Sequence, residues 1–214
     1  MTLPAHQQPG MTLARWLLEQ LHDPAFLPVM YPALFARGID DGALHAYMLS
    51  ALVLVGHRLG YSPVCDSPIF DRLDKLLMGE GAKRPDAVWF SRTDQTPRCL
   101  VEFERYTPNA LAPKARNLLI MGKQISATLD LIVLDYWTYI PVPDAQLAAP
   151  LAIFSHGFTH ATGMSFSALP CPALVLETQV EARDGKTAIS HVAPRLVIAD
   201  GEHKPYMLRE LTLR

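Results

Sequence analysis

The stretch from Leu129 to Trp137 constrains the fold of this chain more than any other. It reads Leu-Asp-Leu-Ile-Val-Leu-Asp-Tyr-Trp, so apolar residues fall on both sides of any strand built from it. Such a strand is typical of the interior of an α/β sheet, where helices cover both faces. We therefore expect residues 129–136 to form a central strand.

Two segments with apolar residues at helical spacing could cover this sheet. The clearer one spans residues 44–59 and stops before Gly60, a residue that commonly ends a helix. The other spans residues 108–126 and leaves three basic side chains on its outer side. We expect residues 44–59 on one face of the sheet and residues 111–125 on the other. Shorter helices are predicted at residues 11–22, 24–37, 71–78 and 144–154.

The remaining strands are shorter, and turn residues separate them. Strands are predicted at residues 61–65, 87–90, 99–104, 173–180 and 187–192. The last two form a hairpin about Asp184-Gly185, and a second hairpin, residues 195–199 with 206–213, is predicted about Asp200-Gly201. This order predicts an α/β (α+β) fold, with a central mixed sheet flanked by helices. We divide it into an N-terminal helical extension (1–40), a core (41–140) and a C-terminal extension packed on the core (141–214).

Composition limits the partners and the location that we expect. The chain has 214 residues and a net charge of -2, so no overall positive field attracts nucleic acid and any such surface must be local. Residues 72–124 carry ten basic and six acidic residues, a local net charge of +4. No two of the three cysteines have the spacing of metal ligands. The N-terminus has no signal-peptide pattern, and no apolar stretch approaches the roughly 20 residues that span a membrane. We expect a cytoplasmic protein with no membrane partner.

Three carboxylates stand out around two of the predicted strands. Asp86 directly precedes one strand, and Glu102 and Glu104 lie two positions apart on the next, so they point to the same face. If these strands pair as a hairpin, the three carboxylates lie close together. Their repulsion and burial are costly, and a divalent cation would offset that cost. Such a cation could activate water and stabilise the charge on a phosphodiester during hydrolysis.

These residues and their order resemble the PD-(D/E)XK nuclease superfamily. The resemblance rests on Arg84-Pro85-Asp86, Glu102-Phe103-Glu104, the basic helix after them and the central strand, and it covers about residues 41–137. It implies a restriction-endonuclease-like core and a metal-dependent nuclease that acts on DNA, with RNA less favoured. It also implies that Mg²⁺ or Mn²⁺ is bound by Asp86, Glu102 and the backbone carbonyl of Phe103.

The chain departs from the superfamily pattern at the catalytic lysine. Glu104 occupies the position where the superfamily usually has a lysine that polarises the attacking water. In some members this lysine has moved to the following helix, and Lys114 is then the first choice here and Lys123 the second. No acid lies in the helix of residues 44–59. The catalytic set implied by the resemblance is therefore Asp86, Glu102, Glu104 and Lys114.

Basic residues near the motif are the expected contacts to nucleic acid. They are Lys83, Arg84, Arg105, Arg116 and Lys123. Two other functions stay open: a catalytically inactive protein of the same fold that binds nucleic acid or a protein partner, and a structural protein whose acids merely face solvent. A homodimer is also left open.

Overall fold

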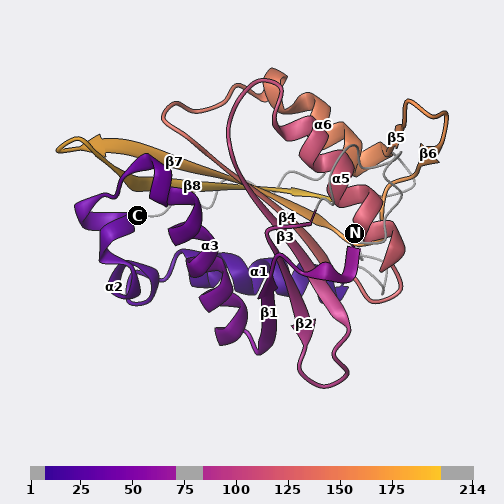
Figure 1. The fold of residues 1–214 in the computed structure, drawn as a ribbon, viewed down its shortest axis with the longest axis horizontal. Coiled ribbons are helices and arrows are strands. Elements are labelled where there is room, and N and C mark those ends of the chain that lie inside the picture. The colour runs from indigo at the N-terminus through magenta and orange to yellow at the C-terminus, as the bar shows by residue number, and fades with distance from the viewer. Residues whose placement is uncertain (1–7, 71–83, 199–214) are drawn as a thin grey trace.

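The computed structural model describes residues 8–70 and 84–198, and they form a six-stranded mixed sheet with helices on both faces and a separate two-stranded sheet (Figure 1). The helical elements are α1 (Gln8–Leu21), α2 (Leu27–Met30), the π-helical turn η2 (Ala33–Arg37), α3 (Asp41–Arg58), the 3-10 turn η3 (Pro68–Phe70), α5 (Leu111–Gln124) and α6 (Asp144–His156). The strands are β1 (Tyr61–Cys65), β2 (Ala87–Ser91), β3 (Pro97–Arg105), β4 (Leu131–Thr138), β5 (Phe158–Thr159), β6 (Ser165–Phe166), β7 (Ala173–Arg183) and β8 (Lys186–Val197).

The six-stranded sheet has the order β1-β2-β3-β4-β7-β8. Strands β3, β4 and β7 run parallel in the middle, and the remaining pairs are antiparallel. Every residue of β4 is buried, which confirms the predicted central strand. The predicted fold class is confirmed as well, and the arrangement is consistent with a restriction-endonuclease-like core.

Alternation along the strands divides the apolar residues into two cores. One core joins α1 and α3 to side chains such as Val101 and Val133, and the other joins α5 and α6 to side chains such as Leu100 and Leu134. Neighbouring strand residues thus point to opposite layers. The expectation that residues 44–59 and 111–125 cover opposite faces is confirmed.

Two predicted elements differ from the structure because of proline. The single helix predicted over residues 24–37 is instead α2 followed by η2, with Pro32 between them. Proline has no backbone N–H for the helical ladder and disfavours the helical conformation in the residue before it. Conversely, β8 runs through Pro194, where the prediction placed a break. β8 lies at the edge of the six-stranded sheet next to β7, with a single bridge from Thr187 to Ile39 on its other side, and an edge strand tolerates proline.

The part of the chain after residue 140 contributes directly to the sheet. Strand β7 pairs in parallel with β4, and β8 pairs with β7, so both continue the sheet past the central strand. The helix predicted at residues 71–78 and the strand predicted at residues 206–213 lie outside the described residues. No helix in the described part is long and apolar enough to cross a membrane.

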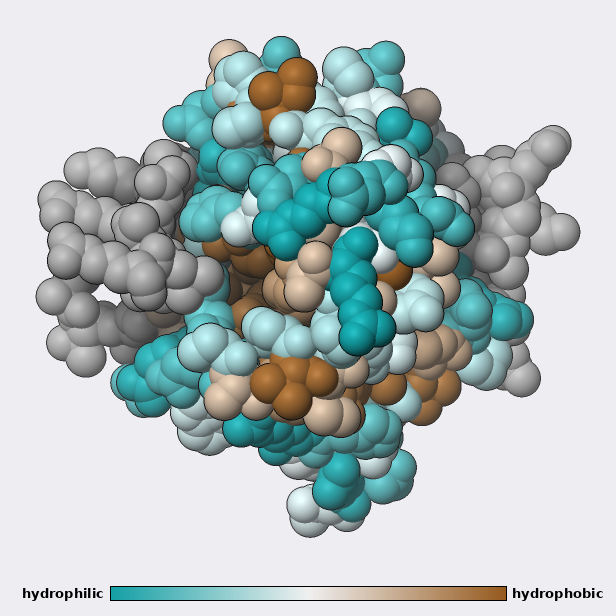
Figure 2. All heavy atoms as spheres, turned by 90° about the vertical axis from the view of Figure 1, so that its left-hand side faces the viewer, coloured by the Kyte–Doolittle hydropathy of each residue, from teal (hydrophilic) through white to brown (hydrophobic). Residues whose placement is uncertain are grey.

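One end of the molecule exposes scattered apolar side chains. Figure 2 shows the end that lies on the left in Figure 1, where hydrophobic residues are interrupted by hydrophilic ones. Val29 and Met30 of α2 are among the exposed apolar residues. Apolar residues that are exposed singly are normal on a protein surface.

Candidate active site

Strand β3 carries two glutamates toward the layer of α5. Val101 and Phe103 belong to the core under α3, so Glu102 and Glu104 take the opposite face by alternation. Glu102 is 4% exposed, whereas Glu104 is partly exposed. The predicted common orientation of the two glutamates is therefore found, with one of them deep and the other near the surface.

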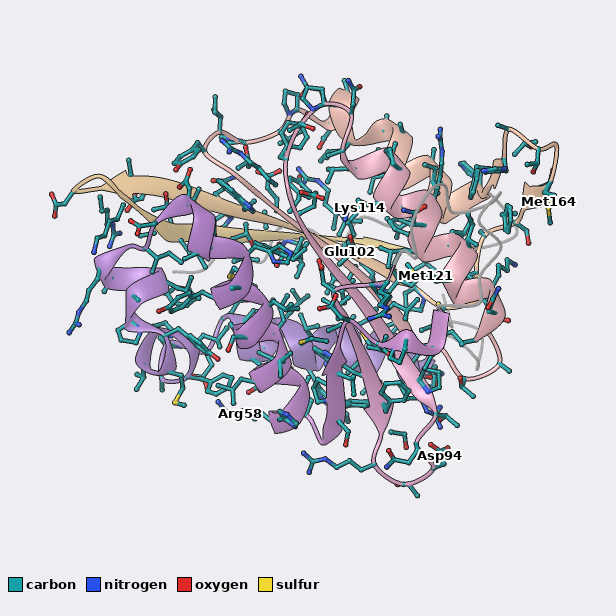
Figure 3. The ribbon with its side chains drawn as sticks, viewed as in Figure 1. Arg58, Asp94, Glu102, Lys114, Met121 and Met164 are labelled. Carbon is teal, nitrogen blue, oxygen red and sulfur yellow. The ribbon has the colours of Figure 1, made fainter. Side chains whose placement is uncertain are left out.

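Lys114 of α5 joins the two glutamates. Its Nζ donates a hydrogen bond to Glu102 Oε1 and lies 3.2 Å from Glu104 Oε2. In Figure 3, Glu102 on the sheet and Lys114 on α5 lie next to each other. Burial lowers the pKa of Lys114, but the charges and hydrogen bonds of the two glutamates outweigh burial and raise the net pKa. Lys114 is therefore a cation at neutral pH, at the place predicted for the displaced lysine.

Asp86 meets β3 through the backbone. The pairing of β2 with β3 ends at Ala87 and Val101, so Phe103 has no β2 residue opposite its N–H. Asp86 Oδ2 accepts a hydrogen bond from this N–H at 2.7 Å. The Asp86 carboxylate thus accepts the backbone N–H that β2 leaves unpaired, and this hydrogen bond fixes it beside Glu102 and Glu104.

His45 of α3 completes this side of the site, and sequence reasoning missed it. Its Nε2 lies 3.3 Å from Asp86 Oδ2, and its ring centroid lies 5.6 Å from that of Phe103. The hydrogen bond to Asp86 is the largest of the effects that raise the pKa of His45, and the carbonyl of Phe103 adds to the rise, while burial opposes it. The one available signal was a polar residue beside Leu44 in a mostly apolar helix. Residues 44–59, the part of this helix that was predicted from the sequence, contain no acid.

Glu102 has the strongest electrostatic perturbation among these side chains. Burial raises its pKa to about 7, and the negative charge of Asp86 adds to the rise, while Lys114 opposes it. The effect of Asp86 shows that the two carboxyl groups are close enough to interact. A buried acid beside a second acid is unfavourable unless cations compensate.

The residues around Glu102 suit a hard divalent cation. Carboxylate and carbonyl oxygens are the donors that Mg²⁺ prefers, and one or two carboxylates completed by water suffice. Asp86, Glu102 and the Phe103 carbonyl supply such donors, and the imidazole of His45 already faces two of them, as a cationic group would. By their chemistry, these donors are of the kind that Mg²⁺ prefers.

Glu104 does not join that set. Within residues 8–70 and 84–198, no group of three or more His, Cys, Asp or Glu residues could hold a metal ion. Glu104 faces Lys114, and its Oε1 accepts the N–H of Arg105 at 2.8 Å. The expected convergence of Asp86, Glu102 and Glu104 on one point is thus not found.

The basic residues predicted to contact nucleic acid are dispersed. Arg105 lies over the Trp137 ring at 4.9 Å, and Arg116 lies over the Phe158 ring at 5.8 Å. Lys123 donates a hydrogen bond to Ser167 Oγ at 2.8 Å, whereas Lys114 is the lysine that contacts Glu102 and Glu104. Lys83 lies outside the described residues.

Arg84 is the one of these basic residues that the described structure places at the acids. A pocket of about 600 Å³ is lined by Asp66, Arg84, Glu102, Glu104 and Lys114, together with Ala110 and further residues of α5. The Arg84 guanidinium donates to the carbonyl of Asp66 at 3.2 Å, which holds it at this pocket. The pocket therefore presents both acids and bases to a ligand.

Comparison with known proteins adds no relative. No protein-family model matches the chain, and neither curated proteins nor solved structures gave a significant match. A function for this chain must therefore be inferred from the site alone.

Proposed function

We propose that this protein is a divalent-metal-dependent nuclease that hydrolyses phosphodiester bonds, with DNA favoured over RNA as the substrate. The observation that carries the proposal is the contact of Lys114 with Glu102, beside Asp86. A cationic lysine, two interacting carboxyl groups and an adjoining pocket are what metal-assisted hydrolysis of a phosphodiester requires. The burial of Glu102 argues against the alternative of a structural protein whose acids merely face solvent.

Asp86, Glu102 and the Phe103 carbonyl would hold Mg²⁺ or Mn²⁺. When bound, the ion would supply Lewis-acid stabilisation of the phosphate and a lowered pKa for its water. The hydrogen bond from Phe103 N–H fixes one carboxylate oxygen of Asp86, and His45 faces that same oxygen. These contacts orient the carboxylate before a ligand arrives, which lowers the cost of ordering it.

Lys114 would provide positive charge to the reacting phosphate or orient the attacking water. Because its pKa is raised, it keeps its proton at neutral pH and acts as a donor, not as a base. Glu104 pairs with the Lys114 ammonium group together with Glu102, and so positions this group between the pocket and the sheet. Arg84 gives the pocket a second cation for the phosphate backbone.

A cleavage assay on labelled DNA tests the proposal. Single-stranded and duplex DNA are incubated with Mg²⁺, with Mn²⁺ or with EDTA, and RNA of the same sequence is run in parallel. We expect cleavage with either metal, none with EDTA, and loss of at least about 100-fold in Asp86→Asn. Asp40→Asn is the matched control, because Asp40 is exposed and its side chain makes no capping hydrogen bond. Cleavage by Asp86→Asn at the rate of the control would contradict the assignment.

One observation favours an inactive protein of the same fold as the second candidate. The charges of the site are compensated within the chain, because Lys114 pairs with both glutamates and His45 faces Asp86. In such a protein the pocket would bind nucleic acid or a protein partner without hydrolysis. DNA binding that weakens with salt, without cleavage under any metal condition, would select this alternative.

A further inference from the structure

The pocket at the acids has a wall to which the proposed chemistry assigns no role. Pro113, Asn117 and Met121 line it from α5. Lys114, Asn117 and Met121 recur at the spacing of one helical face, so a single side of α5 carries a cation, an amide and an apolar group in order. In Figure 3, Met121 lies further along α5 than Lys114.

Asn117 is the polar group of this wall. It is half-buried, and its side-chain amide makes no hydrogen bond to any residue that the structure describes. An amide offers both donors and an acceptor, which match the hydrogen-bonding edge of a nucleobase. Pro113 and Met121 on either side offer apolar surface on which a flat ring can lie.

The depth of Glu102 limits how a phosphodiester can reach it. The side chain is 5% exposed, so the reacting phosphate must come into the pocket instead of resting across its mouth. A base in a duplex is stacked and paired, and an enzyme reaches it only after it has left the stack or in a single strand. A pocket of about 600 Å³ has the size of a small-molecule site, which holds a nucleotide but not a double helix.

We propose that this pocket binds one unpaired nucleotide beside the reacting phosphate, so that the substrate is single-stranded DNA or an unpaired end. The inference rests on the proposed nuclease function and specifies its substrate. The base lies against Pro113 and Met121, and Asn117 hydrogen-bonds its edge. Lys114, one turn before Asn117 on the same face of α5, and Arg84 face the phosphate.

A substrate panel with matched variants tests this site. One labelled strand is presented alone, in a blunt duplex, and in a duplex with a single-stranded overhang, each with Mg²⁺. We expect the single strand to be cut at least about tenfold faster than the blunt duplex, and the overhang to be cut within its unpaired part. Asn117→Leu should raise KM for the single strand about fivefold or more, because the base loses its polar contact. Asn109→Leu makes the same change at an exposed residue outside the pocket, and thermal melts of both variants check their folding.

The outcomes separate this inference from the proposed function. Equal cleavage of blunt duplex and single strand would overturn the inference while leaving a metal-dependent nuclease in place. The inference is also overturned if folded Asn117→Leu has the KM of the Asn109→Leu control. Absence of cleavage with all three substrates, in a protein whose melting transition shows it to be folded, would overturn both. A single-strand preference that Asn117→Leu weakens supports both.

Discussion

Replacing Asp135 with asparagine should stabilise the protein in a manner that depends on pH. Asp135 lies in β4 beside Phe103, fully buried in the core under α3. Its Oδ1 accepts a hydrogen bond from Thr178 at 2.8 Å, and its Oδ2 has no partner among the described residues. Burial raises the pKa of Asp135 from 3.8 to about 8, although the Thr178 hydrogen bond opposes the rise.

The sign and size of the effect follow from this pKa. Below pH 3.8 the side chain is protonated in both the folded and the unfolded chain, so its titration does not change the free energy of unfolding. Between pH 3.8 and about 8 the unfolded chain releases the proton and the folded chain keeps it, so the folded protein loses about 1.4 kcal/mol per pH unit. At pH 7 the loss reaches about 4 kcal/mol, and above pH 8 it levels off. An asparagine side chain at this position would have a similar shape and no titration.

Urea unfolding at several pH values measures this difference. Tryptophan fluorescence gives the free energy of unfolding of wild type and Asp135→Asn between pH 4 and pH 8. The two proteins should be nearly equal at pH 4, and the variant should gain about 4 kcal/mol relative to wild type by pH 7. Taking the difference removes the titration of all other groups. If the two proteins gave parallel pH curves, burial would not have raised the pKa of Asp135.

Three further predictions concern the site and its support. Lys114→Met should lower the cleavage rate about 100-fold while the melting transition stays cooperative, as steady-state kinetics and thermal melts will show; an unchanged rate contradicts its role. His45→Ala should destabilise the protein by less than about 1 kcal/mol, because the imidazole is half exposed. The pKa of His45 is raised above 6.5 in the folded state, so the loss of stability should be full below pH 6.5 and should vanish as the pH rises through the folded-state pKa. Urea unfolding at pH 5.5 and pH 9 measures this loss. A larger loss at pH 9 than at pH 5.5 would contradict the raised pKa. Gly56→Ala should lower the free energy of unfolding by about 1–3 kcal/mol, because the new Cβ would lie 2.8 Å from the Trp89 ring. Gly42→Ala is the control in the same helix, because its new Cβ meets nothing within 4 Å and should not destabilise the protein. Equal effects of the two variants in urea unfolding would contradict the close packing of Gly56 against Trp89.

The elements that were predicted well from sequence are those whose signal is local. The strand that became β4 is apolar on both faces, and that pattern alone required helices on two sides. The common face of Glu102 and Glu104 follows from alternation, and Lys114 lies about one turn into the next helix, where it could reach them. These relations need only the geometry of a strand and of a helix.

The features that sequence reasoning missed depend on distant parts of the chain. His45 precedes Asp86 by 41 positions, and their contact exists only because α3 packs across the sheet beside Phe103. The pairing of β7 with β4 likewise depends on which edge of the sheet is free, and no residue of β7 specifies its partner. The pairing of Glu104 with Lys114, at 3.2 Å between Oε2 and Nζ, likewise joins a strand to a helix that follows it in the chain.

The dependence of cleavage on Mg²⁺ in wild type and in Glu102→Gln is the sharpest test of the proposed metal site. Single-turnover rates on labelled single-stranded DNA are measured from EDTA to millimolar Mg²⁺, with Glu19→Gln, an exposed glutamate of α1, as the matched control. We expect a rate that rises with Mg²⁺ and saturates in wild type and the control, and that falls at least about 100-fold in Glu102→Gln. Cleavage that persists in EDTA, or a Glu102→Gln rate equal to that of Glu19→Gln, would contradict a metal-dependent nuclease with Glu102 at its centre.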